Sequence, residues 1–197
     1  MKIRILLFCA FAVFVTLTLF ACSPWRSGAP VTVENVLSEN DSLKIIPPVN
    51  IAIMKLADSL GPAIAPTYET AVCTEYLIGV LNKIHPLTKK QMNIIRIVDH
   101  DTLELAIAAD AANIRGVQTA LVKSNLGIPI DNPEDVRPGD LLQFWNVSYR
   151  GPKGHCGIVL DLVPYRYITM MSSSTRTNGH GIQTFWWPEK TYFVRMM

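Results

Sequence analysis

The amino-acid sequence predicts an α+β domain in which N-terminal helices pack against a C-terminal antiparallel sheet. Between residues 51 and 124, apolar side chains recur with a helical period. From about residue 140 onward, short apolar runs alternate with clusters of Gly, Pro, Asn and Ser, which is the pattern of strands joined by turns. Helices followed by strands, rather than the two in alternation, favour an antiparallel sheet.

The individual elements follow from start and stop signals along the chain. Gly61 and Pro62 are expected to end the first helix, and Pro86 to end the second, for which Thr70 is the expected N-cap. The helical segments expected are residues 51–60, 71–84, 87–98 and 102–124, the last divided near Asn113–Gly116. Five strands are expected, over residues 140–147, 154–163, 166–173, 181–188 and 190–197.

Composition and the N-terminus indicate one exported domain. A chain of 197 residues suffices for a hydrophobic core, and the net charge of +2 comes without the basic block that binds nucleic acid. Lys2 and Arg4 precede an apolar run that ends at Ala21, which predicts a signal peptide over residues 1–21. The alternatives are an ordinary cleaved signal peptide without a lipid and an uncleaved anchor.

The end of this run, "LFACS", resembles the lipobox of bacterial lipoproteins, which implies lipidation of Cys22. No Asp follows Cys22, and by resemblance to Gram-negative lipoproteins this favours the outer membrane, with the protein facing the periplasm. Residues 22–50 are rich in Ser, Pro, Asn and charge, so we expect a lipidated tether with little regular structure. The functional domain is then expected over residues 51–197.

Two residues far apart in the sequence have the chemistry of a nucleophile and its base. Cys73 lies near the start of the expected helix 71–84, where unpaired N–H groups stabilise a thiolate and an oxyanion. His155 opens the apolar strand "GHCGIVLDL". A histidine on a strand that faces a cysteine at a helix tip is a recurring arrangement of cysteine nucleophiles. The sequence therefore predicts a Cys73–His155 dyad.

Two alternatives use the same residues. In an oxidising compartment, Cys73 and Cys156 are candidates for a disulfide. Because neighbouring side chains of a strand point to opposite faces, we expect only one of His155 and Cys156 to face Cys73, so that dyad and disulfide exclude each other. A metal site of Cys73, His155 and a further histidine is disfavoured, since no ligand spacing supports it. No cofactor is expected.

The strand region resembles the second half of NlpC-type cell-wall peptidases and the related CHAP amidases. The segments "RPGD" (137–140) and "GHCGI" (154–158) match the family's turn and histidine strand, and residues 66–185 follow its order of elements. Before the nucleophile the chain departs from the family, because "VCTE" replaces the usual "DCSG". The resemblance implies a papain-like fold, with Cys73 as nucleophile and His155 as base.

The resemblance also implies a polar residue, on the strand after the histidine strand, that orients the imidazole. Ser172 and Asn178 are the candidates, and a backbone carbonyl is the alternative. Gln143 is a candidate to line the site or to donate to an oxyanion, although a solvent-facing place on a half-buried strand is the favoured interpretation. Trp186 and its neighbour Trp187 either stack on a sugar ring or form the core and rim of the last strand pair.

Together these features predict an exported, lipid-anchored cysteine hydrolase. By resemblance, it cleaves amide bonds in the peptide part of peptidoglycan through an acyl-enzyme. The expected partners are peptidoglycan stem peptides and, through the lipid on Cys22, the membrane. Two alternatives stay open: a non-catalytic cell-wall-binding module on the same fold, and an amide- or acyl-transferring enzyme that uses the same dyad.

Overall fold

The computed structural model describes residues 30–39, 46–97 and 103–197, and it is an α+β structure in which the helices precede the sheet. The helices are α1 (Val33–Glu39), α2 (Pro48–Ile64), α3 (Cys73–Ile84), α4 (Lys89–Arg96), α5 (Leu103–Ala108), the 3-10 turn η2 (Ala112–Ile114) and α6 (Gly116–Val122). The strands are β1 (Gly127–Ile130), β2 (Leu141–Ser148), β3 (Gly151–Val163), β4 (Tyr167–Ser174), β5 (Gly179–Trp186) and β6 (Lys190–Met196), with the 3-10 turn η3 (Pro133–Asp135) between β1 and β2.

The strands form one antiparallel sheet in the order β1-β6-β2-β3-β4-β5. The five expected strands are present, and β1 is a sixth that the sequence pattern did not indicate. This strand has only four residues, and Pro129 interrupts its run. A strand with a proline is tolerated at the edge of a sheet, which is where β1 pairs with β6 alone.

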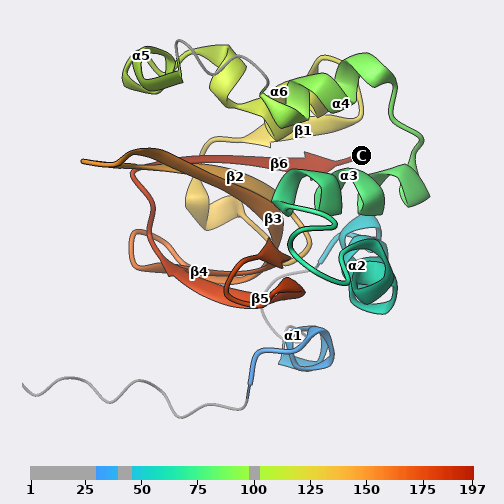
Figure 1. Cartoon of the computed structure of the whole chain (residues 1–197). Coiled ribbons are helices and arrows are strands. Elements are labelled where there is room, and N and C mark those ends of the chain that lie inside the picture. The colour runs from blue at the N-terminus through green and yellow to red at the C-terminus, as the bar shows by residue number, and fades with distance from the viewer. Residues whose placement is uncertain (1–29, 40–45, 98–102) are drawn as a thin grey trace, which may run out of the picture. The chain divides into compact units, whose positions relative to one another are not determined.

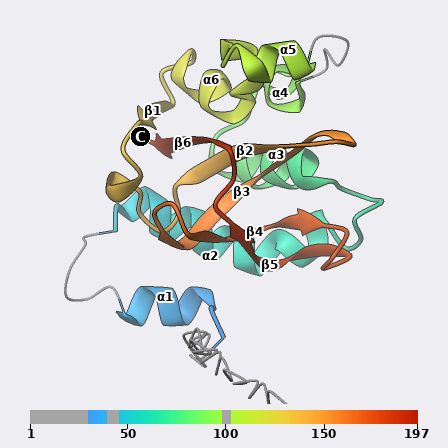
Figure 2. The ribbon, with the colours of Figure 1, turned by 90° about the vertical axis from the view of Figure 1, so that its left-hand side faces the viewer.

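The two faces of the sheet carry different cores. Apolar side chains of α1, α2, α3, α4 and α6 pack on one face, against Leu141, Ile158 and Val194 among others. The other face carries a second core that includes Phe144, Met170 and Phe193. In Figure 1 the strands descend from β1 to β5, with α2 and α3 on the right; Figure 2 shows the same elements after a quarter turn. The α3 tip thus meets the sheet near its centre, at β3 and β4.

The end of the first expected helix differs from the sequence prediction. The helix expected to end at Gly61 and Pro62 continues to Ile64, and the Ala65 N–H closes its last turn on the Gly61 carbonyl. Gly61 is a packing position rather than a stop, because a Cβ there would lie 2.3 Å from Nδ1 of His180. The expected division of the last helical segment near Asn113–Gly116 is confirmed by η2 and α6.

The expected tether contains a helix. In α1, Val33 and Val36 are buried in the same core as α2 and α3, so the expectation of little regular structure is wrong for residues 33–39. Burial against the domain stabilises a helix too short to persist alone. The predicted signal peptide and Cys22 lie outside the described residues. Within the described ranges, no helix has the length and apolar character needed to cross a bilayer.

The turn "RPGD" encloses a buried carboxylate. Asp140 has no exposed surface, and its carboxylate accepts two hydrogen bonds from Arg195, at 2.8 and 2.7 Å. It accepts two more, from the Arg137 backbone N–H at 2.7 Å and from Nδ2 of Asn50 at 2.8 Å. Since Asn50 lies on α2 and Arg195 on β6, this cluster joins the helical layer to the sheet.

A glycine in this turn permits the contact with α2. Gly139 has φ +86°, and a Cβ there would lie 2.5 Å from the Asn50 Cβ. Gly151 has a similar φ of +91°, but a Cβ there would meet only Oε1 of Glu104, at 3.5 Å. The two positions therefore share the same backbone strain on substitution and differ in the space available.

We expect Gly139→Ala to lower the free energy of unfolding by about 1–3 kcal/mol more than Gly151→Ala does, because only the first substitution forces a methyl group into packed atoms. Urea unfolding of both variants measures the difference. Equal losses at the two positions would show that backbone strain, and not the contact with Asn50, is what Gly139 relieves.

Candidate active site

Cys73 is the first residue of α3, and no side chain caps this helix N-terminus. The N-cap residue is Val72, in an extended conformation, so the expectation that Thr70 caps the helix is wrong. The Thr70 hydroxyl instead pairs with that of Thr67, at 2.8 Å. N–H groups in the first turn of a helix have no intrahelical acceptor, so an uncapped tip is suited to a negative charge.

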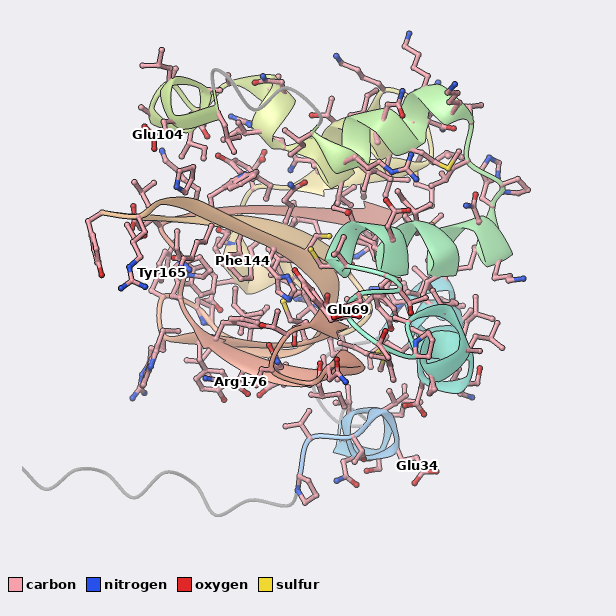
Figure 3. The ribbon with its side chains drawn as sticks, in the orientation of Figure 1. Glu34, Glu69, Glu104, Phe144, Tyr165 and Arg176 are labelled. Atoms are coloured by element: carbon pink, nitrogen blue, oxygen red, sulfur yellow. The ribbon has the colours of Figure 1, made fainter. Side chains whose placement is uncertain are left out.

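The loop before α3 is held against the end of the sheet. The Ser173 hydroxyl on β4 donates to the Ala71 carbonyl at 2.5 Å, two residues before Cys73. The His180 N–H on β5 donates to the Ala65 carbonyl at 2.9 Å. Figure 3 shows Glu69 in this loop and Phe144 on the sheet side of the same region. These bonds hold the tip of α3 beside β3 and β4.

The sheet opens where the tip of α3 meets it. Along β3, pairing with β4 starts only at Ile158 opposite Met171, whereas pairing with β2 extends back to Gly151. In the stretch of β3 that has no β4 partner, the Cys156 carbonyl accepts from the Ser172 hydroxyl at 2.6 Å. The Cys156 backbone N–H is among the groups that lower the pKa of Cys73. We infer that the Cys73 sulfur lies at the open edge of β3, where a ladder partner would otherwise lie.

Both His155 and Cys156 lie close enough to the Cys73 thiol to lower its pKa through their side chains. The expectation that only one of the two faces Cys73 is therefore wrong. Side chains of consecutive strand residues do point to opposite faces, and Cys156 belongs to the core beneath the helices, while His155 packs on Phe144 of the other face. A sulfur at the strand edge, rather than above one face, is reached from both sides.

The Cys73 thiolate is stabilised by its neighbours. The hydrogen bond from the Cys156 thiol contributes most to holding the pKa of Cys73 well below its ordinary value, burial opposes the shift, and His155 lowers the pKa further. Donation to Cys73, together with burial, raises the pKa of the Cys156 thiol well above its ordinary value. Neither of these two cysteines is in a disulfide. The two shifts therefore favour a thiolate at Cys73 over one at Cys156.

Aromatic rings surround the imidazole of His155. The ring of Phe144 meets it edge-on with 5.8 Å between centroids, and that of Phe185 lies at 5.3 Å. Nε2 is buried and has no hydrogen-bond partner among the described residues. The ring contacts of this imidazole are therefore aromatic, and they orient it between Phe144 and Phe185.

Neither candidate for a polar orienting residue bonds to the imidazole. The Ser172 hydroxyl donates to the Cys156 carbonyl at 2.6 Å and makes a longer contact with the Ser173 carbonyl at 3.5 Å. Asn178 is exposed in the turn between β4 and β5, with φ +48°, a conformation that suits Asn in turns. The structure thus brings Cys73 and His155 together and leaves Ser172 and Asn178 without a bond to the ring.

Gln143 is buried at the site, with 4% of its surface exposed, so the solvent-facing interpretation is wrong. It lies opposite Cys156 in the β2–β3 register, and its Oε1 accepts from the Val117 N–H at the start of α6, at 2.9 Å. No group of the described residues accepts from its Nε2. The sequence contained a signal for the burial of Gln143, because a lone amide in the apolar run "LLQFW" is expected to have a buried hydrogen-bond partner.

The remaining residues singled out by the sequence lie apart from the sulfur. Trp186 is 78% exposed on the edge strand β5. Trp187 packs between Tyr165 and Phe193, at the edge of the second core. In the part of the chain that the structure describes, no three His, Cys, Asp or Glu side chains are grouped as metal ligands.

The lowered pKa of Cys73 can be tested by replacing Cys156, the residue that contributes most to the shift. We expect Cys156→Ala to move the pH midpoint of Cys73 alkylation by iodoacetamide upward, since removing the donor raises the lowered pKa of the thiol toward its ordinary value. Cys156→Ser, whose hydroxyl still donates, should stay near the wild-type midpoint. An unchanged midpoint in Cys156→Ala would contradict the assigned hydrogen bond.

No family model, curated protein or solved structure matches this chain. The candidate site therefore rests on its own geometry, and the likeness of residues 137–160 to NlpC-type peptidases remains a likeness of sequence motifs.

Proposed function

We propose that this protein is a cysteine hydrolase that cleaves amide bonds through an acyl-enzyme. The observation that carries the proposal is the Cys73 sulfur at the uncapped tip of α3, whose pKa is lowered by Cys156 and by His155. A thiolate is the reactive form of cysteine, and its population at neutral pH is what nucleophilic catalysis requires.

In the proposed first step, the thiolate attacks the carbonyl carbon of the amide, and negative charge develops on the carbonyl oxygen. Two sets of donors are suited to this oxygen: the N–H groups in the first turn of α3, and Nε2 of Gln143. Because Val117 holds Oε1 of Gln143, the amide is fixed before substrate arrives. Donors that are already oriented stabilise the transition state without reorganisation.

His155 has two tasks in this mechanism. It first donates a proton to the departing amine, which breaks the C–N bond and leaves a thioester on Cys73. It then takes a proton from the water that attacks the thioester, which releases a carboxylic acid and restores the thiolate. Packing between Phe144 and Phe185 limits the rotation of the ring, a role that a polar third residue has in other cysteine hydrolases.

The substrate and compartment belong to the same proposal. The motifs at 137–140 and 154–158 resemble those of cell-wall peptidases, which supports a papain-like arrangement and peptidoglycan stem peptides as substrate. The apolar run before Cys22 supports export and lipid attachment, with the domain facing the periplasm. The exposed Trp186 supplies a surface on which a sugar ring of the same polymer can stack.

The test is incubation of the purified protein with peptidoglycan sacculi and isolated muropeptides, followed by mass spectrometry. A hydrolase adds one water to each bond it breaks, giving a new amine and a new carboxylic acid. Products joined to another amine without added water would identify a transferase instead. Co-sedimentation with sacculi without any product would identify a binding module and would overturn the proposal.

A further inference from the structure

The proposed hydrolysis uses Cys73 as its nucleophile and assigns no role to the neighbouring thiol of Cys156. Cys73 packs against the apolar core that contains Cys156, each thiol shifts the pKa of the other, and neither is in a disulfide. Their accessibility differs: Cys73 is half-buried, whereas Cys156 is 1% exposed. A dissolved oxidant therefore reaches Cys73 first, and Cys156 is the nearest thiol to whatever forms there.

We propose that Cys73 and Cys156 form a reversible disulfide when hydrogen peroxide or a related hydroperoxide oxidises Cys73. Cys73 is the site of oxidation and Cys156 is the resolving cysteine. The inference that this disulfide switches off hydrolysis rests on the proposed function. The inference that the disulfide forms does not.

The chemistry proceeds in two balanced steps. The Cys73 thiolate attacks one peroxide oxygen, the O–O bond breaks, and the products are Cys73 sulfenic acid and hydroxide. The Cys156 sulfur then attacks the sulfenic sulfur, its proton leaves with the displaced oxygen as water, and an S–S bond forms. The two thiols lose two electrons in total, and these reduce one peroxide.

The geometry favours resolution over further oxidation. Cys73 packs against the core cluster to which Cys156 belongs, so a small approach of neighbouring side chains suffices to reach the S–S bond length of about 2.05 Å. The open edge of β3 leaves the Cys156 backbone free of a β4 ladder bond at this point, since pairing with β4 starts at Ile158. A sulfenic acid beside a thiol condenses to a disulfide and is thereby protected from irreversible oxidation.

The consequence for the site follows from the role of Cys73. In the disulfide, its sulfur can neither attack a carbonyl nor react with iodoacetamide. A dithiol reductant restores both thiols by exchange. The oxidised protein is then a reversibly inactivated form of the enzyme rather than an irreversibly oxidised one.

The experiment treats the full-length reduced protein, in detergent, with a small excess of hydrogen peroxide. Remaining thiols are blocked with iodoacetamide, and digested peptides are identified by mass spectrometry. The expected product is one cross-linked species that contains Cys73 and Cys156, lighter than the two reduced peptides by two hydrogens, with Cys73 alkylation lost and then recovered after dithiothreitol. Peptide identification separates this product from oxidation at Cys9 and Cys22.

Two variants serve as controls. In Cys156→Ala, Cys73 should oxidise to sulfinic acid, and dithiothreitol should not restore its alkylation. In Cys73→Ala, Cys156 should stay reduced under the same treatment, because it is buried.

Sulfinic acid on Cys73 of the wild-type protein with Cys156 still reduced would overturn the proposal, and so would two thiols that peroxide leaves unchanged. The mapping of thiols needs no substrate, so its result is independent of whether the protein proves to be a hydrolase.

Discussion

Replacement of Cys73 with Ala is expected to abolish the release of new amine and carboxylic acid groups from peptidoglycan, lowering kcat/KM by about 10⁴-fold or more. The variant removes the sulfur at the tip of α3, whose pKa is lowered by Cys156 and His155. The site retains its oxyanion donors and its binding surface, but these have no nucleophile to act with. The assay is the one described for the wild-type protein, with far-ultraviolet circular dichroism as a test of folding.

A histidine pair supplies the matched control for this prediction. His155→Gln should lose a similar factor, since the leaving amine then has no proton donor. His85 lies at the C-terminal end of α3, at the opposite end from Cys73, and is exposed. His85→Gln should therefore keep wild-type activity. Full activity in either Cys73→Ala or His155→Gln would refute the dyad, because both residues are placed in the reaction itself.

Replacement of Asp140 with Ala is expected to lower the free energy of unfolding by about 3–5 kcal/mol, the usual cost of removing one partner from a buried ion pair. Asp140 has no exposed surface and accepts from Arg195, Arg137 and Asn50. Without the carboxylate, the guanidinium of Arg195 loses its partner, and the Asn50 amide loses one of its two acceptors, since it also donates to the Pro138 carbonyl. The hydrogen-bonded cluster that links α2 to β6 is weakened as a result.

Urea unfolding followed by tryptophan fluorescence measures this loss. Asp131→Asn is the control: Asp131 is exposed, lies in the loop before the same turn, and should change stability by no more than about 0.5 kcal/mol. A loss below about 1 kcal/mol in Asp140→Ala would mean that water replaces the carboxylate and that the cluster contributes little to the fold.

Much of the architecture could be predicted from local pattern. The helical period of residues 71–84 and the turn residues between the strands specify elements through contacts of near neighbours, and these elements are present. The elements that the sequence did not indicate depend on distant residues. The helix α1 is stabilised by burial against α2 and α3, β1 by pairing with β6, and α2 continues through Pro62 because it packs on its neighbours.

The sequence by itself determined that Cys73 lies near the start of a helix and that His155 and Cys156 lie next to each other on a strand. Only the tertiary structure decided what these residues meet. Strand alternation would let one of His155 and Cys156 face Cys73, but β3 and β4 separate before this point, and a sulfur at the open edge contacts both. Pairing between strands and the approach of a helix tip depend on the whole sheet, so no local pattern encodes the place of that opening.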